Sequence, residues 1–358
     1  MAKRDYSLLG EDGRRAVQTG LAAAEWYHTD VPRKVMKELM QRSDRPAIRD
    51  SVIYYGAMIG LAVIGWTLWP SWWSAPFWLA YGVLYGSGSD SRWHEAQHGT
   101  AFKTPWMNEV VYQIACFMIV RNPTGWRWSH ARHHTDTYIV GRDPEIALMR
   151  PPVFFKLLGN FIGIFDGYNG WMRMFLNAAG RIDPQEATYI PSTEYPKVIR
   201  VARIWVAIYA ATLGLALYMG SILPFMVIGL PRLYGAWHHI MTGLLQHGGL
   251  ADNVIDHRLN SRTVYMNPVS RFIYWNMNYH VEHHMFPMVP YHALPRLHAL
   301  IKHDLPAPNP SIPQAFQEMW PALRRQLAYD DYFVKRALPA TAQPYREDFH
   351  QAALGAAE

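Results

Sequence analysis

Long uncharged stretches alternate with polar, histidine-containing segments along most of the chain. Ser51–Trp69 and about Trp73–Ser89 carry no charge and flank a short turn. About Ile204–Met219 and Phe225–Ile240 flank a second turn. An apolar helix of about 20 residues crosses the ~30 Å hydrocarbon core of a bilayer. The pattern therefore predicts an all-α, integral membrane protein with about four transmembrane helices in two hairpins.

The other apolar segments are too short or too polar to cross a membrane. Residues 107–120 predict a re-entrant or interfacial helix, because about 14 apolar residues are short for a span. Phe154–Phe175 contains three charged residues, so we expect helices that lie in the interface or pack on a polar cap. An amphipathic helix is expected near residues 312–328. Within the fourth stretch, Arg232 should point inward, because a charge at that depth is costly unless it faces protein.

The distribution of positive charge sets the expected orientation. Both turns between the apolar stretches lack Lys and Arg, whereas the histidine-containing segments are rich in Arg. The positive-inside rule then puts both termini and a helical cap on the cytoplasmic side of, we expect, a bacterial cytoplasmic membrane. The expected organisation is an N-terminal segment (1–50), a membrane domain (51–304) and a C-terminal tail (305–358).

Composition narrows this picture. Hydrophobic residues make up 50% of the 358 residues and aromatics 14%, while mean hydropathy is only −0.13, which fits a few spans and a large cap. The net charge of +6 indicates a surface for anionic lipid or an acidic protein partner, and no nucleic acid is expected. The single cysteine, Cys116, excludes an internal disulfide and an iron–sulfur cluster. No cleavable targeting segment is expected, because an apolar signal-peptide core is missing.

Eight of the 17 histidines fall into three clusters with helical spacing. Histidines at i, i+3 and i+4 share one face of a helix. Eight imidazoles are too many for one tetrahedral zinc ion and suit two transition-metal ions held on facing helices. The clusters are His94 and His98; His130, His133 and His134; and His280, His283 and His284.

Several acidic and amide side chains are candidates for the environment of these histidines. Glu95 and Glu282 are rotated by roughly 100–200° from the histidine face of a helix, so we assign them to outer contacts or to structure. Ligating histidines nearly always donate their other N–H to an acceptor, and Asp136, Asp143, Asp252 and Asp256 are candidate acceptors. Asn276 and Asn278 are candidates either for supporting a ligand or for capping.

The motif set His-x3-His, His-x2-His-His and His-x2-His-His, arranged around paired apolar hairpins, resembles the membrane fatty acid desaturase and hydroxylase superfamily. Residues 278–284, Asn-Tyr-His-Val-Glu-His-His, followed by Phe286-Pro287, look like its third histidine box. The resemblance covers about residues 50–304. Two shorter motifs, residues 133–138 and 141–145, resemble the bacterial branch associated with rhizopine catabolism and hydrocarbon oxygenation.

The resemblance implies two non-haem iron ions that activate O2. The implied reaction hydroxylates or desaturates an unactivated C–H bond of a lipid, a hydrocarbon or a small methylated substrate. The resemblance also carries over His247, in Gln246-His-Gly-Gly, as a ninth ligand. The remaining histidines are expected to be structural or on the surface: His28, His238, His239, His257, His292, His298, His303 and His350.

Each turnover of such an enzyme needs two electrons. The chain has no His-Pro-Gly-Gly haem signature and no dinucleotide-binding glycine pattern, so we expect no bound flavin, haem or iron–sulfur cluster. A separate ferredoxin or rubredoxin with its reductase should dock on the basic cytoplasmic face. The many Trp and Tyr residues are interpreted as interfacial belts and core.

Two other functions compete with this interpretation. His94-Glu95-x-x-His98 matches the zinc metallopeptidase signature, in which the glutamate is the general base, but an intramembrane protease leaves six clustered histidines unexplained. A metal-binding or metal-transport membrane protein would need ionisable residues within several spans, and these spans are nearly free of them.

Overall fold

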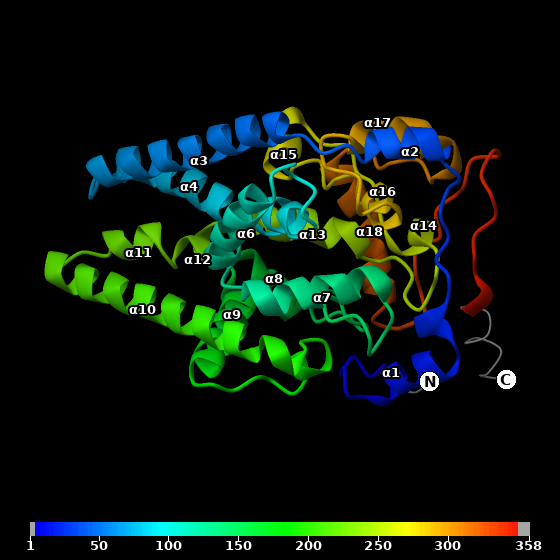
Figure 1. The fold of residues 1–358 in the computed structure, drawn as a ribbon, viewed down its shortest axis with the longest axis horizontal. Helices are drawn as coiled ribbons and strands as arrows, with labels where there is room; N and C mark the ends of the chain where they lie inside the picture. The colour runs from blue at the N-terminus through cyan, green and yellow to red at the C-terminus, as the bar shows by residue number, and fades with distance from the viewer. Residues whose placement is uncertain (1–3, 350–358) are drawn as a thin grey trace.

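The computed structural model describes residues 4–349 as a helical protein whose only β pairing, within that range, is two isolated bridges. The all-α expectation is confirmed. Two helical hairpins extend to the same side of the molecule, on the left in Figure 1, and the remaining helices form a cap at the other end. Helix α1 (Glu11–Gln18), in blue, and the red segment near the C-terminal side of the described residues both lie at the cap end.

The first hairpin consists of α3 (Asp44–Thr67) and α4 (Ala75–Gly86). Helix α3 begins before the apolar stretch, with Asp44 in its first turn, where a carboxylate is favoured by the helix dipole. In the turn between the helices, the Ser71 hydroxyl accepts a hydrogen bond from the backbone N–H of Trp73. The apolar stretch and its tight turn are therefore as predicted, but the helix is longer than the stretch.

The second hairpin begins with α10 (Tyr195–Met219), which ends at Gly220 in the left-handed conformation. The prediction of one helix over Phe225–Ile240 is wrong. Gly229 has a φ of +94° and breaks the segment, and Pro231 begins a new helix. The chain therefore forms three helices: α11 (Leu223–Val227), α12 (Pro231–Tyr234) and α13 (Ala236–His247).

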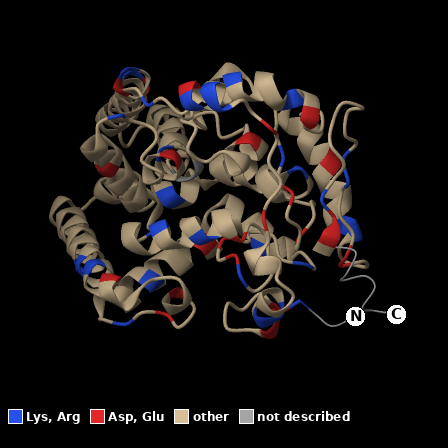
Figure 2. Cartoon of the chain, turned by 45° about the vertical axis from the view of Figure 1, so that its right-hand side comes forward, with Lys and Arg blue, Asp and Glu red and all other residues tan. Residues whose placement is uncertain are grey.

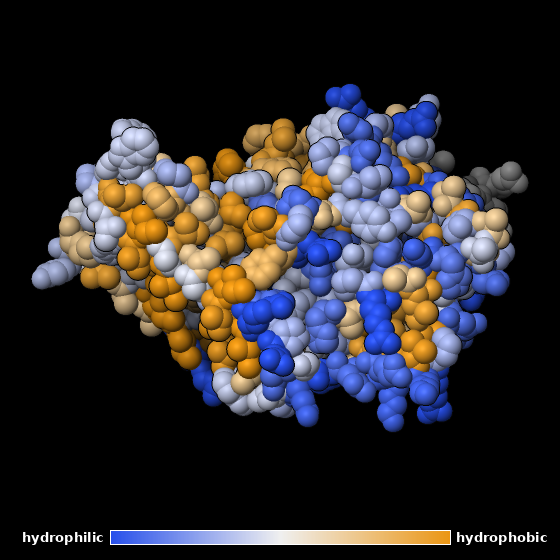
Figure 3. Space-filling view, turned by 90° about the horizontal axis from the view of Figure 1, so that it is seen from above, coloured by the Kyte–Doolittle hydropathy of each residue, from blue (hydrophilic) through white to orange (hydrophobic). Residues whose placement is uncertain are grey.

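Two helical stretches, Arg33–Thr67 and Ser192–Met219, are long and apolar enough to cross a membrane. Their apolar side chains face outward: Ile59 is 62% exposed and Leu217 is 73% exposed. Figure 3 shows apolar surface concentrated over the hairpin end and hydrophilic surface over the cap. Figure 2 shows the charged residues mostly away from the hairpin helices. Exposed apolar area of this extent indicates a surface that lipid or protein covers.

Helices α12 and α13 pack against α4 at the base of the hairpins. A Cβ atom on Gly235 would lie 1.8 Å from the Gly82 carbonyl oxygen, so only glycine permits this approach. Arg232 is buried, donates to the Ile119 carbonyl oxygen at 3.2 Å and forms an ion pair with Asp166. The inward orientation of Arg232 is confirmed.

The cap contains the histidine clusters and most of the core. Helix α6 (Pro105–Ile119) is central to this core, and the amphipathic helix predicted near 312–328 is α18 (Ile312–Arg325). The other helices are α1 (Glu11–Gln18), α2 (Arg33–Leu39), α5 (His94–Gln97), α7 (Pro123–Thr135), α8 (Phe154–Phe161), α9 (Ile164–Ala178), α14 (His257–Asn260), α15 (Pro268–Ile273), α16 (His280–Met285) and α17 (Leu294–Ile301). Short 3-10 turns are Leu21–Ala23, Trp72–Ser74, Glu186–Thr188, Ser192–Glu194 and Lys302–Asp304, and Ser89–Trp93 is a π-helical turn.

Candidate metal centre

Each histidine cluster lies on or at the end of a helix, as predicted. His94 begins α5, which continues from α4 through the π-helical turn, and His98 is the C-cap of α5. Helix α7 begins with Pro123 at its first position, and the Asn122 side chain accepts from the backbone N–H of Thr124 at 3.1 Å. This cap satisfies an otherwise unpaired donor and fixes where the helix starts.

The structure sorts the nine predicted histidines into two groups. Within each group, one nitrogen from every histidine lies within 4.8 Å of those of the others. Group one is His94, His98, His130, His134 and His283, and group two is His133, His247, His280 and His284. Two sets of converging nitrogens indicate two metal positions.

The sorting follows from helix geometry. Residues at i and i+4 lie on the same face, whereas successive residues are rotated by about 100°. His130 and His134 therefore share group one, and His280 and His284 share group two. The i+3 residue of each cluster, His133 or His283, belongs to the opposite group. Helices α7 and α16 thus contribute to both groups.

The spacing of the ring nitrogens fits ligation of metal ions. The Nε2 atoms of His130 and His134 are 3.0 Å apart, and those of His134 and His283 are 3.2 Å apart. In group two, the Nε2 atom of His280 is 3.0 Å from those of His247 and His284. Two imidazoles bound to one ion at about 2.0–2.1 Å have nitrogens about 3 Å apart. A donor set of imidazoles alone suits iron, copper or zinc.

Burial keeps these imidazoles neutral. Burial, and then the neighbouring imidazoles, lowers the pKa of His130 and of His284 well below the usual value. The same causes lower the pKa of His98 to about 4. A neutral imidazole has the lone pair that a metal requires, so the site is prepared for ions at neutral pH.

Two carboxylates accept hydrogen bonds from the outer ring nitrogens. Nδ1 of His133 lies 2.9 Å from Asp143 Oδ2, and Nδ1 of His130 lies 2.9 Å from Glu145 Oε2. Asp143 thus contacts a histidine of group two, as the prediction requires, whereas Glu145 was missed as a partner. The backbone N–H of Glu145 donates to Asp143 Oδ1 at 2.8 Å, so one turn presents both carboxylates to α7. The signal was present in the Asp143-Pro-Glu145 sequence, but only the folded loop shows which way it points.

Neutral groups support two further histidines of group two. Nδ1 of His247 donates to the Asn260 carbonyl oxygen at 2.7 Å, and Nδ1 of His284 lies 3.3 Å from the Thr137 hydroxyl. Such contacts fix the ring orientation and leave Nε2 facing inward. Sequence reasoning missed both, because a backbone carbonyl and a threonine carry no recognisable motif.

The structure pairs three predicted acceptors with arginines, which corrects their assignment. Asp136 accepts from Arg142, Asp252 pairs with Arg4, and Asp256 pairs with Arg258. A buried carboxylate is costly unless it is paired, and for each of these three a guanidinium group from an arginine is the partner.

Glu95, Glu282 and Asn278 have structural contacts. Glu95 accepts from the Thr100 hydroxyl at 2.7 Å and from the Tyr291 backbone N–H at 3.0 Å. Glu282 accepts from the Thr263 hydroxyl at 2.6 Å and pairs with His298, a histidine outside both groups. The Asn278 side-chain amide donates to the Val264 carbonyl oxygen at 2.9 Å. Both glutamates were assigned either to outer contacts of the histidines or to a structural role. Their hydrogen bonds correspond to the structural role.

The remaining histidines lie outside the two groups. His238 contacts Ser87, His239 lies beside Arg232, and His298 contacts Glu282 and Tyr265. His28 and His303 are exposed, His257 is buried and His292 is half-buried, while His350 lies outside the described residues. Asn276 donates to the Tyr291 carbonyl oxygen.

Comparison with known proteins gives a consistent result. The fatty acid desaturase family model matches residues 67–316. A chloroplastic omega-3 fatty acid desaturase of Glycine max is 24% identical over 282 residues, covering 71% of this chain and 58% of that protein. A chloroplastic sn-2 acyl-lipid omega-3 desaturase (ferredoxin) of Arabidopsis thaliana is 24% identical, covering 69% and 58%. An endoplasmic reticulum acyl-lipid omega-3 desaturase (cytochrome b5) of the same plant is 23% identical, covering 77% and 74%. The chain thus spans about 58% of the length of the first of these relatives.

Proposed function

Because this chain belongs to the fatty acid desaturase family, we propose that it is a membrane-bound, O2-dependent di-iron oxidoreductase that desaturates a lipid acyl chain. The observation that carries the proposal is the sorting of nine histidines into two groups of converging nitrogens. The similarity to acyl-lipid desaturases favours desaturation of a lipid. Hydroxylation, and a hydrocarbon or a small methylated compound as substrate, form the wider proposal.

The nine histidines would hold two iron ions, one in each group. Bound iron would supply the activation of O2 needed to break an unactivated C–H bond. In desaturation, two hydrogens from the substrate, O2, two electrons and two protons give one carbon–carbon double bond and two water molecules. The protein's part is to hold the metals, exclude water and fix which carbon faces them.

The carboxylates beside α7 have a defined part in this function. Asp143 and Glu145 accept from the Nδ1–H of His133 and His130. Each contact holds the imidazole in the tautomer whose Nε2 lone pair faces the metal, and raises the basicity of the ligand. Burial raises the pKa of Glu145 to about 8.

We propose that the two hairpins embed the protein in a bacterial cytoplasmic membrane. Helices α3 and α10 are each long enough to cross it, while α4 and the broken α11–α13 segment complete the four passes. The cap, both termini and the histidine groups would lie on the cytoplasmic side. The proposed organisation remains an N-terminal segment (1–50), a membrane domain (51–304) and a tail (305–358), and the family match to residues 67–316 is compatible with it.

The electrons are proposed to come from a separate ferredoxin with its reductase. Three relatives carry ferredoxin in their names, and another carries cytochrome b5. A rubredoxin is the other carrier that the sequence leaves open.

The competing functions are not favoured. A zinc peptidase would use His94 and His98 as ligands, but both belong to a group of five histidines that also includes members from α7 and α16. A metal transporter would need ionisable groups along the spans, and Arg232 there is already paired with Asp166.

Metal content of the detergent-purified protein, with and without His283→Ala, tests the proposal. We expect about two iron ions per chain, fewer in the variant, and formation of a lipid double bond when O2 and reduced ferredoxin are supplied. Two zinc ions would keep the two-metal site and call for reconstitution with iron. A single zinc ion unaffected by His283→Ala would overturn the proposal.

A further inference from the structure

An N-terminal aromatic residue is stacked against the metal centre. The Trp26 ring lies 4.2 Å from the His257 ring, between centroids, with planes inclined by only 6°. The His257 ring is in turn 5.0 Å from the ring of His284, a member of group two. Trp26 is half-buried, whereas His257 is buried. The three rings therefore link the protein surface to group two without a gap.

The stack is anchored to helix α7 and to the loop that carries His257. The Trp26 indole N–H donates to the carbonyl oxygen of Thr135, the last residue of α7, at 3.0 Å. The backbone N–H of Tyr27 donates to the Ile255 carbonyl oxygen at 2.9 Å. Trp26 is thus tied to the helix that carries the second cluster and to the loop that carries His257.

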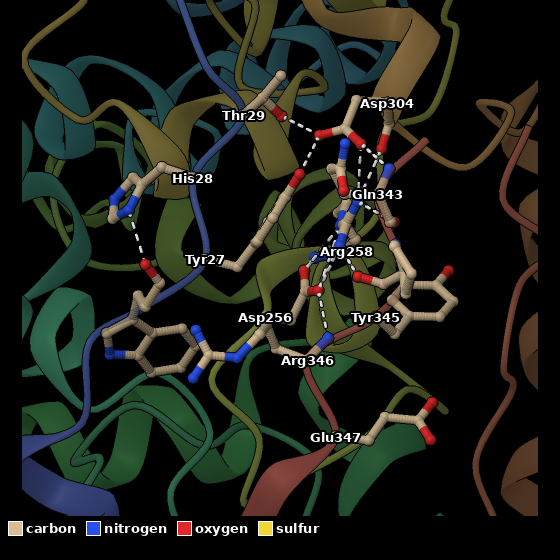
Figure 4. A network of polar contacts seen from close by, with 12 residues as sticks. Tyr27, His28, Thr29, Asp256, Arg258, Asp304, Gln343, Tyr345, Arg346 and Glu347 are labelled. Carbon is tan, nitrogen blue, oxygen red and sulfur yellow. Dashed lines mark hydrogen bonds and ion pairs between the residues drawn. The ribbon is translucent and has the colours of Figure 1, made fainter. Parts of the chain in front are cut away.

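A buried ionic network holds this loop in place (Figure 4). Arg258, directly after His257, pairs with Asp256 at 2.7 Å and with Asp304 at 2.9 Å. The Arg258 guanidinium lies 3.7 Å from the centre of the Tyr27 ring. A fully paired buried network of this kind restricts the segments it joins. Here it restricts Tyr27, which follows Trp26, and Arg258, which follows His257.

Asp304 joins the N-terminal segment to the C-terminal tail. It accepts from the Tyr27 hydroxyl at 2.7 Å, from the Thr29 hydroxyl at 2.6 Å and from the Gln343 backbone N–H at 2.9 Å. Asp304 therefore fixes the residues that directly follow Trp26 and ties them to the C-terminal tail.

An open groove lies next to this segment. It has a volume of about 690 Å³, and Phe286, two residues after His284, contributes to its wall. The Phe286 ring is 5.8 Å from the ring of His28, two residues after Trp26. The groove is lined by Thr29, Asp30, Val31, Arg33, Met36, Lys37, Met40 and Phe286.

The surface around the groove is basic. Five exposed cations on α2, at the start of α3 and in the short segment between these helices make no ion pair with any described residue: Arg33, Lys34, Lys37, Arg42 and Arg45. The carboxylate of Glu38 on α2 is already paired with Arg296 at 3.2 Å, which leaves Asp30 as the acidic residue of the groove. A surface with this excess of positive charge attracts an acidic partner and speeds its encounter.

We propose that an acidic ferredoxin docks on this entry face, defined as Trp26, the groove and the five cations, and that electrons enter through Trp26 and His257 to His284. This inference rests on the proposed function. Two reduced ferredoxins would each give one electron per turnover, and no atom is transferred. Methionine and phenylalanine in the groove provide an apolar centre within a charged rim, as in protein interfaces. Helix α2 lies at the cap end, away from the hairpin tips (Figure 1), which favours a soluble partner over a bilayer.

Charge reversal tests the docking surface. Full-length protein with Arg33→Glu and Lys37→Glu is titrated with oxidised [2Fe–2S] ferredoxin, in both metal-free and metal-loaded forms. We expect binding at least about tenfold weaker at low salt, with the difference lost at high salt as screening increases. Arg324→Glu with Arg325→Glu, exposed at the end of α18, is the matched control and should bind as wild type.

Replacement of Trp26 tests the route. At saturating reduced ferredoxin, we expect Trp26→Leu to slow ferredoxin oxidation by the metal-loaded protein about tenfold, and Trp26→Phe to slow it less. The metal content and the rate of reduction by dithionite should stay unchanged, and the saturating ferredoxin concentration removes the effect of any change in Kd. Trp106→Leu, which removes an exposed tryptophan elsewhere, should leave the oxidation rate, the metal content and the dithionite rate unchanged.

The outcomes separate this inference from the proposed function. Unchanged ferredoxin binding after charge reversal, or an unchanged oxidation rate in Trp26→Leu, overturns the entry face or the route respectively. Weaker binding to phosphatidylglycerol vesicles with unchanged ferredoxin binding would assign the face to lipid instead. A wild-type protein that takes up no iron would refute the proposed function, while the titration of metal-free protein would still decide whether the face binds ferredoxin.

Discussion

The two histidine groups differ in how firmly their ligands are held. All four histidines of group two are buried, whereas His98 and His134 of group one are half-buried. In group two, His133, His247 and His284 have outer partners. Group two therefore has the features of a preformed site with fixed ring orientations.

Group one has more ligands but fewer outer contacts. Only His130, with Glu145, and His94, with the Met277 sulfur at 2.9 Å, have such partners among the described residues. Nδ1 of His134 and of His283 has none, and in group two the same holds for Nδ1 of His280 alone. The difference indicates that group one is the adaptable and accessible side of the centre, and group two the rigid side.

The largest expected effect comes from removing one ligand from each group. His284→Ala leaves group two with three imidazoles, so we expect it to lose about half of the bound iron, because affinity falls steeply when a ligand is lost. His98→Ala removes a half-buried member of group one and leaves four imidazoles, three of them buried, so it should retain more iron than loss of the buried His283 or His284. Elemental analysis measures both, and an equal loss from the two variants would break the comparison.

The outer carboxylates should give a smaller effect. Loss of an outer partner typically lowers metal affinity 10–100-fold. Asp143 also accepts from the Tyr138 backbone N–H at 2.8 Å, so Asp143→Ala should weaken iron binding more than Glu145→Ala, which frees only one ring and the Ser129 hydroxyl. Competition with a chromogenic chelator measures the affinities, and the reverse order would show that group one depends more on its support.

Removal of metal should proceed in two phases. A chelator in excess is expected to take the iron of half-buried group one first and that of buried group two several-fold more slowly, since access limits the reaction. The time course of the chelate absorbance reports the phases. Asp143→Ala should speed the slow phase alone, and a single phase in the wild type would mean that the two sites exchange as one unit.

The smallest effect is expected from Glu95→Gln. Glu95 accepts from Thr100 and from the Tyr291 backbone, and glutamine keeps an oxygen acceptor of the same shape. Iron content and desaturation should therefore remain within about twofold of wild type. A loss of desaturation with the metal retained would instead show that the Glu95 carboxylate takes part in the chemistry.

The sequence predicted the histidines better than their arrangement. Spacings of i, i+3 and i+4 identify a helix face without any tertiary information, so eight of the nine histidines could be found directly. His247 needed the family resemblance. The division into groups depends on how α5, α7 and α16 face one another, and no local pattern contains that.

The errors of prediction have identifiable physical causes. The segment at Phe225–Ile240 has the composition of a span, but Gly229 and Pro231 break it into separate helices. Asp136, Asp252 and Asp256 were credible histidine partners until arginines from other segments reached them. Glu145 lies 15 residues from His130, beyond any periodicity, so its contact required the folded loop.

Adjacent histidines in α7 and α16 belong to different histidine groups, which limits the sequence changes that these helices tolerate. Inserting one residue between the histidines of α16 would turn the following ring by about 100° and deny both metals a donor at once. Substitution at the intervening positions, Val281 and Glu282, would leave the register intact. Both groups therefore depend on the same helical register. Insertions or deletions can be accommodated in the connecting loops but not within these short helices.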